Sequence, residues 1–231
     1  MNYKMQHILL LTVLFFSCQK QSTASEENYV LAHWDFNALS GDVLNDISGN
    51  GHDGIIQNPQ WTSGVIDGAL EFKEGNSCVT IPYSHELQPK EEFTLESVVL
   101  FKKLTFFGGE PIITNNYNGG LGLWSWMGLL NIWINIAGQY QSAMDVKDYE
   151  INKWYHLAGT YDGSKLQFYV NYNLVQELDV KGSVNYSVDN ALQIAKEATS
   201  SESPGYRFFT GIIDEIRFTS RRLNTEEFLQ K

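Results

Sequence analysis

The stretch LWSWMGLLNIWI, residues 123–134, holds three tryptophans and no charged residue. It lies in an uncharged run from Pro111 to Met144 that on hydropathy alone would suggest a membrane-spanning helix. Five glycines interrupt this run, and Asn131 and Asn135 lie in its apolar part. The apolar residues recur at every second position, which is the period of a β-strand and not of a helix. We therefore expect two strands here and no transmembrane helix.

The alternation predicts which side chains share a face, if residues 121–126 and 130–136 are the two strands of a hairpin. One face carries the aliphatic side chains and should point into the core: Leu121, Leu123, Leu130, Ile132, Ile134 and Ile136. The opposite face carries three tryptophans and two asparagines: Trp124, Trp126, Asn131, Trp133 and Asn135. We expect this second face to point outward.

The outward tryptophan face admits three interpretations, because a large exposed apolar patch invites aggregation unless something covers it. The first is a carbohydrate-binding face, on which the indoles stack on sugar C–H faces and the asparagines supply hydrogen bonds. The second is a small second core, covered by a loop such as residues 102–116 or 199–206. The third is a protein–protein interface. We favour the first interpretation.

Arg207 is a further candidate binding residue, since it follows Tyr206 in a loop rich in serine and glutamate. A guanidinium group matches sulfate and carboxylate groups with two parallel hydrogen bonds. Arg207 therefore either contacts a sulfate or uronate of a glycan or forms a surface ion pair, and the sequence leaves both roles open.

Short alternating segments dominate the rest of the chain, separated by turns rich in glycine, asparagine and aspartate. We expect further strands at residues 69–72, 77–81, 93–101, 154–161, 165–170, 174–178, 191–194 and 208–218. The only expected helix is the tail, Asn224 to Gln230. No repeat or linker divides residues 29–231, so the pattern predicts a single all-β domain built as an antiparallel sandwich.

Five segments of this domain carry a family resemblance: HWDFNALSGDVLNDISGNGHDGII, WTSGVIDGALEF, FTLESVVLF, NKWYHLAGTYDGSKLQFYVN and FFTGIIDEIRFTSRRLNTEEF. In this order they resemble the signatures of the laminin-G-like group of the concanavalin A-like lectin/glucanase superfamily. The resemblance runs from about Tyr29 to Phe228 and implies a two-sheet jelly-roll sandwich. Trp34, Trp61 and Trp154 fall where this group commonly has a packing aromatic residue. The other three tryptophans do not.

The resemblance also implies a structural calcium ion where the first and last strands meet. Asp214 should face inward with Ile216 and Phe218, and a buried carboxylate must be paired, hydrogen-bonded or metal-bound. The other candidate ligands are Asp35, Asn37, Asp46 and the carbonyls of residues 50–52, all oxygen donors as calcium prefers. The group usually has aspartate where this chain has Asn37, which lowers the ligand charge. An ion pair with Arg217 or Arg221, or a turn-capping role, remains open for Asp214.

One hairpin tip departs from the group, which often has Val-Asn-Gly where this chain has Val170, Asn171, Tyr172 and Asn173. Two-residue hairpin turns need positive φ, which tyrosine disfavours. We expect a shifted turn that uses Asn173. The alternative is that the turn keeps the group's usual position and that Tyr172 lies in it with an exposed ring.

Function is expected to be binding and not catalysis. Glycanases of this superfamily carry E-x-D-x-x-E on one strand, and neither that string nor the lyase strand motifs occur here. A polysaccharide-degrading enzyme and a protein-binding adhesion or scaffold domain remain as alternatives. The chain has 16 lysines and arginines against 27 acidic residues, a net charge of −11, and no basic run, so no nucleic-acid partner is expected.

The N-terminus predicts export and a lipid anchor. An apolar run from Ile8 to Phe16 has the length of a signal-peptide core, and the Ser17-Cys18 pair that follows resembles a bacterial lipobox. We expect a signal peptide at residues 1–17, a palmitate-bearing Cys18 with a polar tether to residue 28, and the domain at 29–231. Lipid on Cys18 would leave Cys78 without a disulfide partner. These features predict a lipoprotein of the bacterial cell envelope, at the outer membrane or cell surface, that captures polysaccharide for glycan utilisation.

Overall fold

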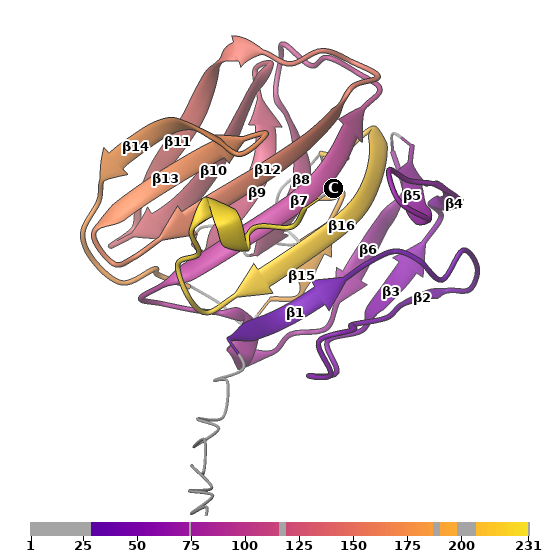
Figure 1. Ribbon diagram of the computed structural model, residues 1–231, viewed down its shortest axis with the longest axis horizontal. Coiled ribbons are helices and arrows are strands. Elements are labelled where there is room, and N and C mark those ends of the chain that lie inside the picture. The colour runs from indigo at the N-terminus through magenta and orange to yellow at the C-terminus, as the bar shows by residue number, and fades with distance from the viewer. Residues whose placement is uncertain (1–28, 74, 116–118, 187–189, 198–206, 231) are drawn as a thin grey trace, which may run out of the picture.

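The computed structural model describes residues 29–73, 75–115, 119–186, 190–197 and 207–230 (Figure 1). The predicted signal peptide, the lipidated Cys18, its tether and the loop Thr199–Tyr206 lie outside the described residues. Within the described ranges no helix has the length and apolar character needed to cross a membrane.

Two antiparallel sheets lie face to face (Figure 1). Sheet A has the order β14 (Asn173–Asp179), β13 (Lys165–Val170), β12 (Trp154–Tyr161), β7 (Phe93–Phe101), β16 (Gly211–Thr219), β5 (Gly68–Phe72) and β4 (Gln60–Ser63), with β1 (Val30–Trp34) also paired to β16. Sheet B has the order β11 (Gln139–Asp148), β10 (Leu129–Ile136), β9 (Leu121–Trp126), β8 (Gly109–Asn115), β15 (Leu192–Ile194), β6 (Cys78–Ile81), β3 (Gly54–Gln57) and β2 (Val43–Leu44). Two short 3-10 helices, η1 (His85–Leu87) and η2 (Thr225–Glu227), complete the described elements. The two-sheet jelly-roll prediction is confirmed.

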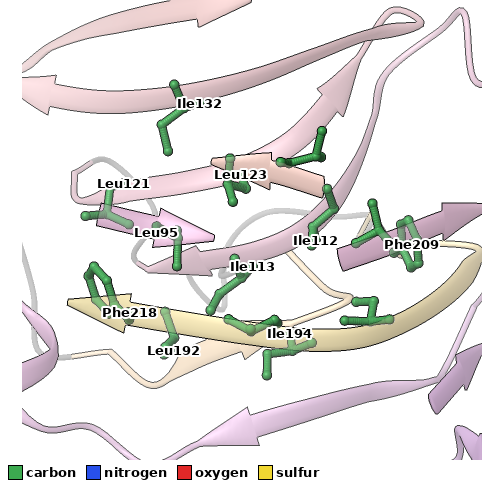
Figure 2. Close-up of a cluster of buried hydrophobic side chains, with 14 of the residues drawn as sticks. Leu95, Ile112, Ile113, Leu121, Leu123, Ile132, Leu192, Ile194, Phe209 and Phe218 are labelled. Atoms are coloured by element: carbon green, nitrogen blue, oxygen red, sulfur yellow. The ribbon is translucent and has the colours of Figure 1, made fainter. Parts of the chain in front are cut away.

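The core fills the space between the inner faces of the two sheets. Leu121, Leu123 and Ile132 of sheet B belong to the same buried cluster as Leu95 and Phe218 of sheet A (Figure 2). These side chains are fully buried, which makes apolar burial the main stabilising contribution of the sandwich.

The tryptophan-rich stretch forms two paired strands, as its alternation predicts. β9 and β10 are antiparallel, with Ser125 opposite Leu130 and Leu121 opposite Ile134. The aliphatic positions of both strands face the core, although Ile136 at the end of β10 is only partly buried. The prediction of a hairpin in place of a transmembrane helix is confirmed.

The C-terminal tail, with its helix η2, lies over part of the outer face of sheet A (Figure 1). Glu96 of β7 is fully buried beneath it. Its Oε2 accepts hydrogen bonds from Arg217 at 2.8 and 2.5 Å, and its Oε1 accepts the Leu229 backbone N–H at 2.8 Å and lies 3.1 Å from His156 Nε2. A buried carboxylate needs such partners, so Glu96 fixes the tail to the sheet.

The turn between β13 and β14 differs from the prediction for this hairpin tip. Val170 pairs with Asn173, so the turn consists of Asn171 and Tyr172 alone, with φ values of 48° and 65°. The predicted shifted turn is therefore wrong. The Tyr172 ring stacks on His156 at 4.5 Å between centroids, and its hydroxyl donates to the Leu229 carbonyl at 3.0 Å. We attribute the tyrosine at this strained position to its contacts with the tail.

Candidate functional site

The outer face of sheet B carries a continuous row of aromatic rings, which we name the aromatic platform: Trp124, Trp126, Trp133 and Tyr140. The Trp124 and Trp126 rings are stacked, with centroids 5.1 Å apart and an interplanar angle of 24°. Trp133 contacts Trp124 at 6.0 Å, and Tyr140 of β11 meets Trp133 edge-on at 5.3 Å. The row crosses three neighbouring strands, β9, β10 and β11.

Two glycines allow the rings to lie close against the sheet. Gly109 of β8 pairs with Trp126, and a Cβ there would lie 2.8 Å from the indole ring. Gly122 of β9 pairs with Trp133, and a Cβ there would lie 2.9 Å from its Nε1. Alternation alone does not assign either glycine to the site, although a glycine inside a strand often indicates close approach of another group.

The exposure of the tryptophans divides the platform into two parts. Trp124 and Trp126 are partly exposed, whereas Trp133 is only 7% exposed beneath its aromatic neighbours. Tyr140 is exposed. All three tryptophans lie on the outer side of sheet B, as their strand parity predicts. Trp124 and Trp126 therefore form an accessible apolar surface, and Trp133 packs beneath it.

The two asparagines of this face are buried and already hydrogen-bonded. Asn131 donates to the Leu129 carbonyl at 3.3 Å and accepts from the Ser142 hydroxyl at 3.4 Å. Asn135 Oδ1 accepts the Gly138 backbone N–H at 2.9 Å in the turn between β10 and β11. Their exposed fractions are 2% and 1%. In this geometry the asparagines hold the strands and the turn that carry the platform.

Arg207 joins the platform from outside the hairpin. Its Cζ lies 5.1 Å from the centroid of the Trp126 ring, in a cation–π arrangement. Its Nη1 donates to both carboxylate oxygens of Glu197 at 2.7 Å. Of the two roles left open by the sequence, the structure therefore shows the ion pair.

A cleft of about 480 Å³ adjoins the Trp126 end of the platform. Its lining includes Thr105, Phe107, Gly109, Glu110 and Arg207. Phe107 is 94% exposed, so it forms an apolar rim. The sequence suggests the loop before β8 only as a cover for the tryptophans. The cleft depends on the folded position of this loop, which alternation cannot predict.

The predicted calcium ligands each have a hydrogen-bonding role of their own. Asp214 is fully buried, and its Oδ2 accepts the Val65 backbone N–H at 2.6 Å. Asp35 accepts the Asn37 backbone N–H at 3.2 Å, and Asn37 Oδ1 accepts that of Gly68 at 2.9 Å. These bonds match the turn-capping alternative for Asp214.

Asp46 belongs to a separate turn, in which it accepts backbone N–H groups of His33, Ser48 and His52 at 2.9–3.0 Å. Burial opposes ionisation of Asp46, but these hydrogen bonds outweigh it and lower its pKa. Over the described ranges no group of three or more His, Cys, Asp or Glu side chains is placed to hold a metal ion. Calcium binding stays a prediction, which the melting temperature with added calcium and with a chelator tests.

Solved structures with the same architecture include domain 4 of AbnA, a GH43 extracellular arabinanase from Geobacillus stearothermophilus, in complex with arabinotriose. That domain matches at 18% identity over 86% of this chain and 95% of its own, with a TM-score of 0.70. The binding domain of Paraclostridial Mosquitocidal Protein 1 matches at 16% identity over 87% of this chain, with a TM-score of 0.68. A structure of botulinum neurotoxin type C matches at 16% identity over 87% of this chain, with a TM-score of 0.64. Cell entry of that toxin depends on interaction with two ganglioside molecules.

This chain spans about half the length of both toxin chains, 51% and 50%. At these identities the likeness shows the fold alone. No curated protein sequence matches significantly. The family model Laminin_G_3, described as Concanavalin A-like lectin/glucanases superfamily, matches residues 73–228, which is more than half of the 231-residue chain. By this match and by its two-sheet architecture, the chain belongs to the concanavalin A-like lectin/glucanases superfamily.

Proposed function

We propose that this protein binds carbohydrate on the aromatic platform and performs no chemistry on it. The observation that carries the proposal is the pair of stacked, partly exposed indoles, Trp124 and Trp126, beside an open cleft. Flat aromatic rings bury the apolar C–H faces of sugars, while polar groups at the edge fix their orientation. A sandwich needs no such exposed rings for its own stability.

The fold relatives support this proposal. The matched arabinanase domain is described in complex with arabinotriose, and this chain covers nearly all of that domain. The type C neurotoxin is described as interacting with gangliosides, which also carry sugars. Because one fold hosts many functions, this support is secondary to the geometry of the platform.

Two carboxylates beside the cleft, Glu110 and Glu197, favour binding over hydrolysis. Glu110 is 2% exposed and accepts hydrogen bonds from the Thr105 hydroxyl and the Thr210 backbone N–H. Glu197 is held by Arg207. A glycosidase needs one carboxyl group free to give a proton and a second free to attack or to activate water. Both groups here serve structural hydrogen bonds.

The proposal includes a setting that rests on the N-terminal sequence. A lipid-anchored Cys18 with a polar tether would hold the domain at a bacterial envelope membrane, at the outer membrane or cell surface. Polysaccharide capture for glycan utilisation suits such a position. The dissociation constant should lie in the micromolar to millimolar range. Burial of the two partly exposed indoles contributes about 1.5–3 kcal/mol each, and this gain must offset the entropy lost when the glycan chain becomes ordered on binding.

Affinity gels containing algal, plant and bacterial polysaccharides test the proposal, with and without calcium. We expect at least one polysaccharide to retard the parent protein, and Trp124→Ala and Trp126→Ala to abolish that retardation without unfolding. Tyr83→Ala is the matched control, because Tyr83 is another exposed aromatic residue, outside the platform. No retardation by any glycan would contradict the proposal.

The alternatives give different results. A protein-docking surface would bind a partner protein, and soluble glycan would not compete with that binding. An enzyme would release new reducing ends or unsaturated products from the polymer.

A further inference from the structure

Arg207 lies between the aromatic platform and the cleft, so its chemistry influences which sugars fit there. It lines the cleft, and its guanidinium lies over the Trp126 ring. An arginine in such a position would ordinarily attract sulfate or carboxylate groups, because its N–H fork matches them with two hydrogen bonds.

One nitrogen of the Arg207 guanidinium, Nη1, is already paired with a carboxylate. Both oxygens of Glu197 accept hydrogen bonds from its Nη1 at 2.7 Å. The backbone holds the two residues together, since the Glu197 N–H donates to the Arg207 carbonyl at 3.0 Å beside a bridge between Lys196 and Phe208. The Glu197 side chain is 13% exposed and the Arg207 side chain is 39% exposed, so solvent screens the pair mainly from the arginine side. An anionic sugar that approached the guanidinium would therefore meet a fixed carboxylate that occupies its Nη1 and offsets its charge.

The remaining charges do not favour an anion either. The charged residues that line the cleft, among those described, are Lys103, Glu110 and Arg207. With Glu197 against Arg207, two positive groups face two negative groups. The whole chain carries a net charge of −11, which repels polyanions at long range. A neutral sugar loses nothing to these charges and can still stack on the indoles and on the flat guanidinium.

We propose that the platform and cleft select neutral glycans, and that Glu197 is the residue that determines this selectivity. Glu197 holds Arg207 as a flat surface beside Trp126, occupies its Nη1 and offsets the positive charge that would attract sulfate and uronate groups. This inference rests on the proposed carbohydrate-binding function. It identifies the chemical class of ligand and a residue whose role is to exclude the competing class.

The test compares polymers that share a backbone and differ in charge, using the full chain. Suitable probes are methyl-esterified against de-esterified polygalacturonate, and dextran against dextran sulfate, with arabinan as a further neutral polymer. We expect the parent to bind at least one neutral polymer, and to bind charged polymers at least tenfold more weakly than neutral ones. In Glu197→Gln the ratio of charged-polymer to neutral-polymer affinity should rise at least tenfold, and high salt should remove the gain.

Two variants keep the result interpretable. Glu177→Gln removes the same charge from β14 in the other sheet, where Glu177 pairs with Lys165, and should leave the ratio as in the parent. The double variant Glu197→Gln with Arg207→Gln should lose the gain, because the gain needs the freed guanidinium. A parent that binds charged and neutral polymers equally, or a Glu197→Gln ratio equal to the parent's in a folded protein, overturns this inference and leaves carbohydrate binding standing. Binding to no polymer in any pair or in the gel panel overturns both.

Discussion

The outer faces of the two sheets differ in what covers them. On sheet A, the buried Glu96 and its partners Arg217 and His156 lie beneath the C-terminal tail, which adds Leu223 and Phe228 to a small apolar cluster. On sheet B, the corresponding surface carries stacked indoles that stay partly exposed. Among the described residues, the tail satisfies the buried Glu96 and packs on Ala158 and Tyr169 of sheet A, whereas the indoles of sheet B stay partly exposed. The open face of sheet B is therefore where a ligand is expected.

The largest expected effect is on the covered face. Glu96→Ala should lower the free energy of unfolding by about 3–5 kcal/mol, because it leaves the Arg217 charge under the tail without its carboxylate. Chemical denaturation measures this loss. Glu150→Ala, which removes an exposed pair with Lys153, is the control and should change stability little. A Glu96→Ala protein as stable as the control would show that the tail is not anchored through this carboxylate.

Within the platform, substitution of the buried tryptophan and of a partly exposed tryptophan should affect stability and binding differently. Trp133→Ala should cost about 3–5 kcal/mol of stability, because Trp133 is 7% exposed and its removal leaves a cavity. Trp124→Ala should cost clearly less, because that ring is partly exposed, and should weaken glycan binding. Denaturation curves and affinity gels on both variants measure the split. Equal losses of stability would favour the small-core interpretation of all three rings.

The turn at Tyr172 gives a smaller effect with a diagnostic sign. Glycine suits a φ of 65°, so backbone preference alone predicts that Tyr172→Gly stabilises the protein by about 1–2 kcal/mol. We expect a net loss of about 1 kcal/mol, because the variant removes the stack on His156 and the hydrogen bond to Leu229. Tyr172→Phe isolates the hydrogen bond. Stabilisation by glycine would mean that the ring does not hold the tail.

The smallest expected effect is a pH dependence from Asp46. Its folded-state pKa is lowered below 3.8, mainly by backbone hydrogen bonds acting against burial, so the ionised form stabilises the folded state above that pH. This contribution is lost as the pH falls from about 3.8 through the lowered folded-state pKa. Asp46→Asn should therefore flatten the stability curve in that acidic window. If the free energy of unfolding falls equally steeply with acid pH in the parent and in Asp46→Asn, Asp46 is not the source of this pH dependence.

Alternation predicted the strands whose two sides differ clearly. β7, β9, β12 and β13 begin and end at the predicted residues. β8 was missed because Gly109 and Pro111 interrupt its pattern, and the register between Pro111 and Ile113 is irregular. β11 was missed because it is a long, largely polar edge strand with no buried apolar face to reveal it.

The sequence predicted which face of the sheet carries the tryptophans, but not how deeply each ring is buried. Strand parity placed Trp124, Trp126 and Trp133 on one face. The burial of Trp133 depends on Tyr140, which lies on a strand that the sequence did not reveal. The pairing of Arg207 with Glu197 depends on two segments meeting at the bridge between Lys196 and Phe208, and no local pattern encodes that contact. Composition and parity identify a surface, and only tertiary contacts show which of its groups remain available.

The most direct test of the account follows the indole N–H signals of the isotope-labelled protein by nuclear magnetic resonance while it is titrated with a polysaccharide retained in the gels. Single Trp→Phe variants assign the six signals. We predict that the signals of Trp124 and Trp126 shift with a common affinity while that of Trp34, fully buried in the core, stays in place. A glycan that binds while shifting only tryptophans outside the platform would contradict the assignment of the binding face to sheet B.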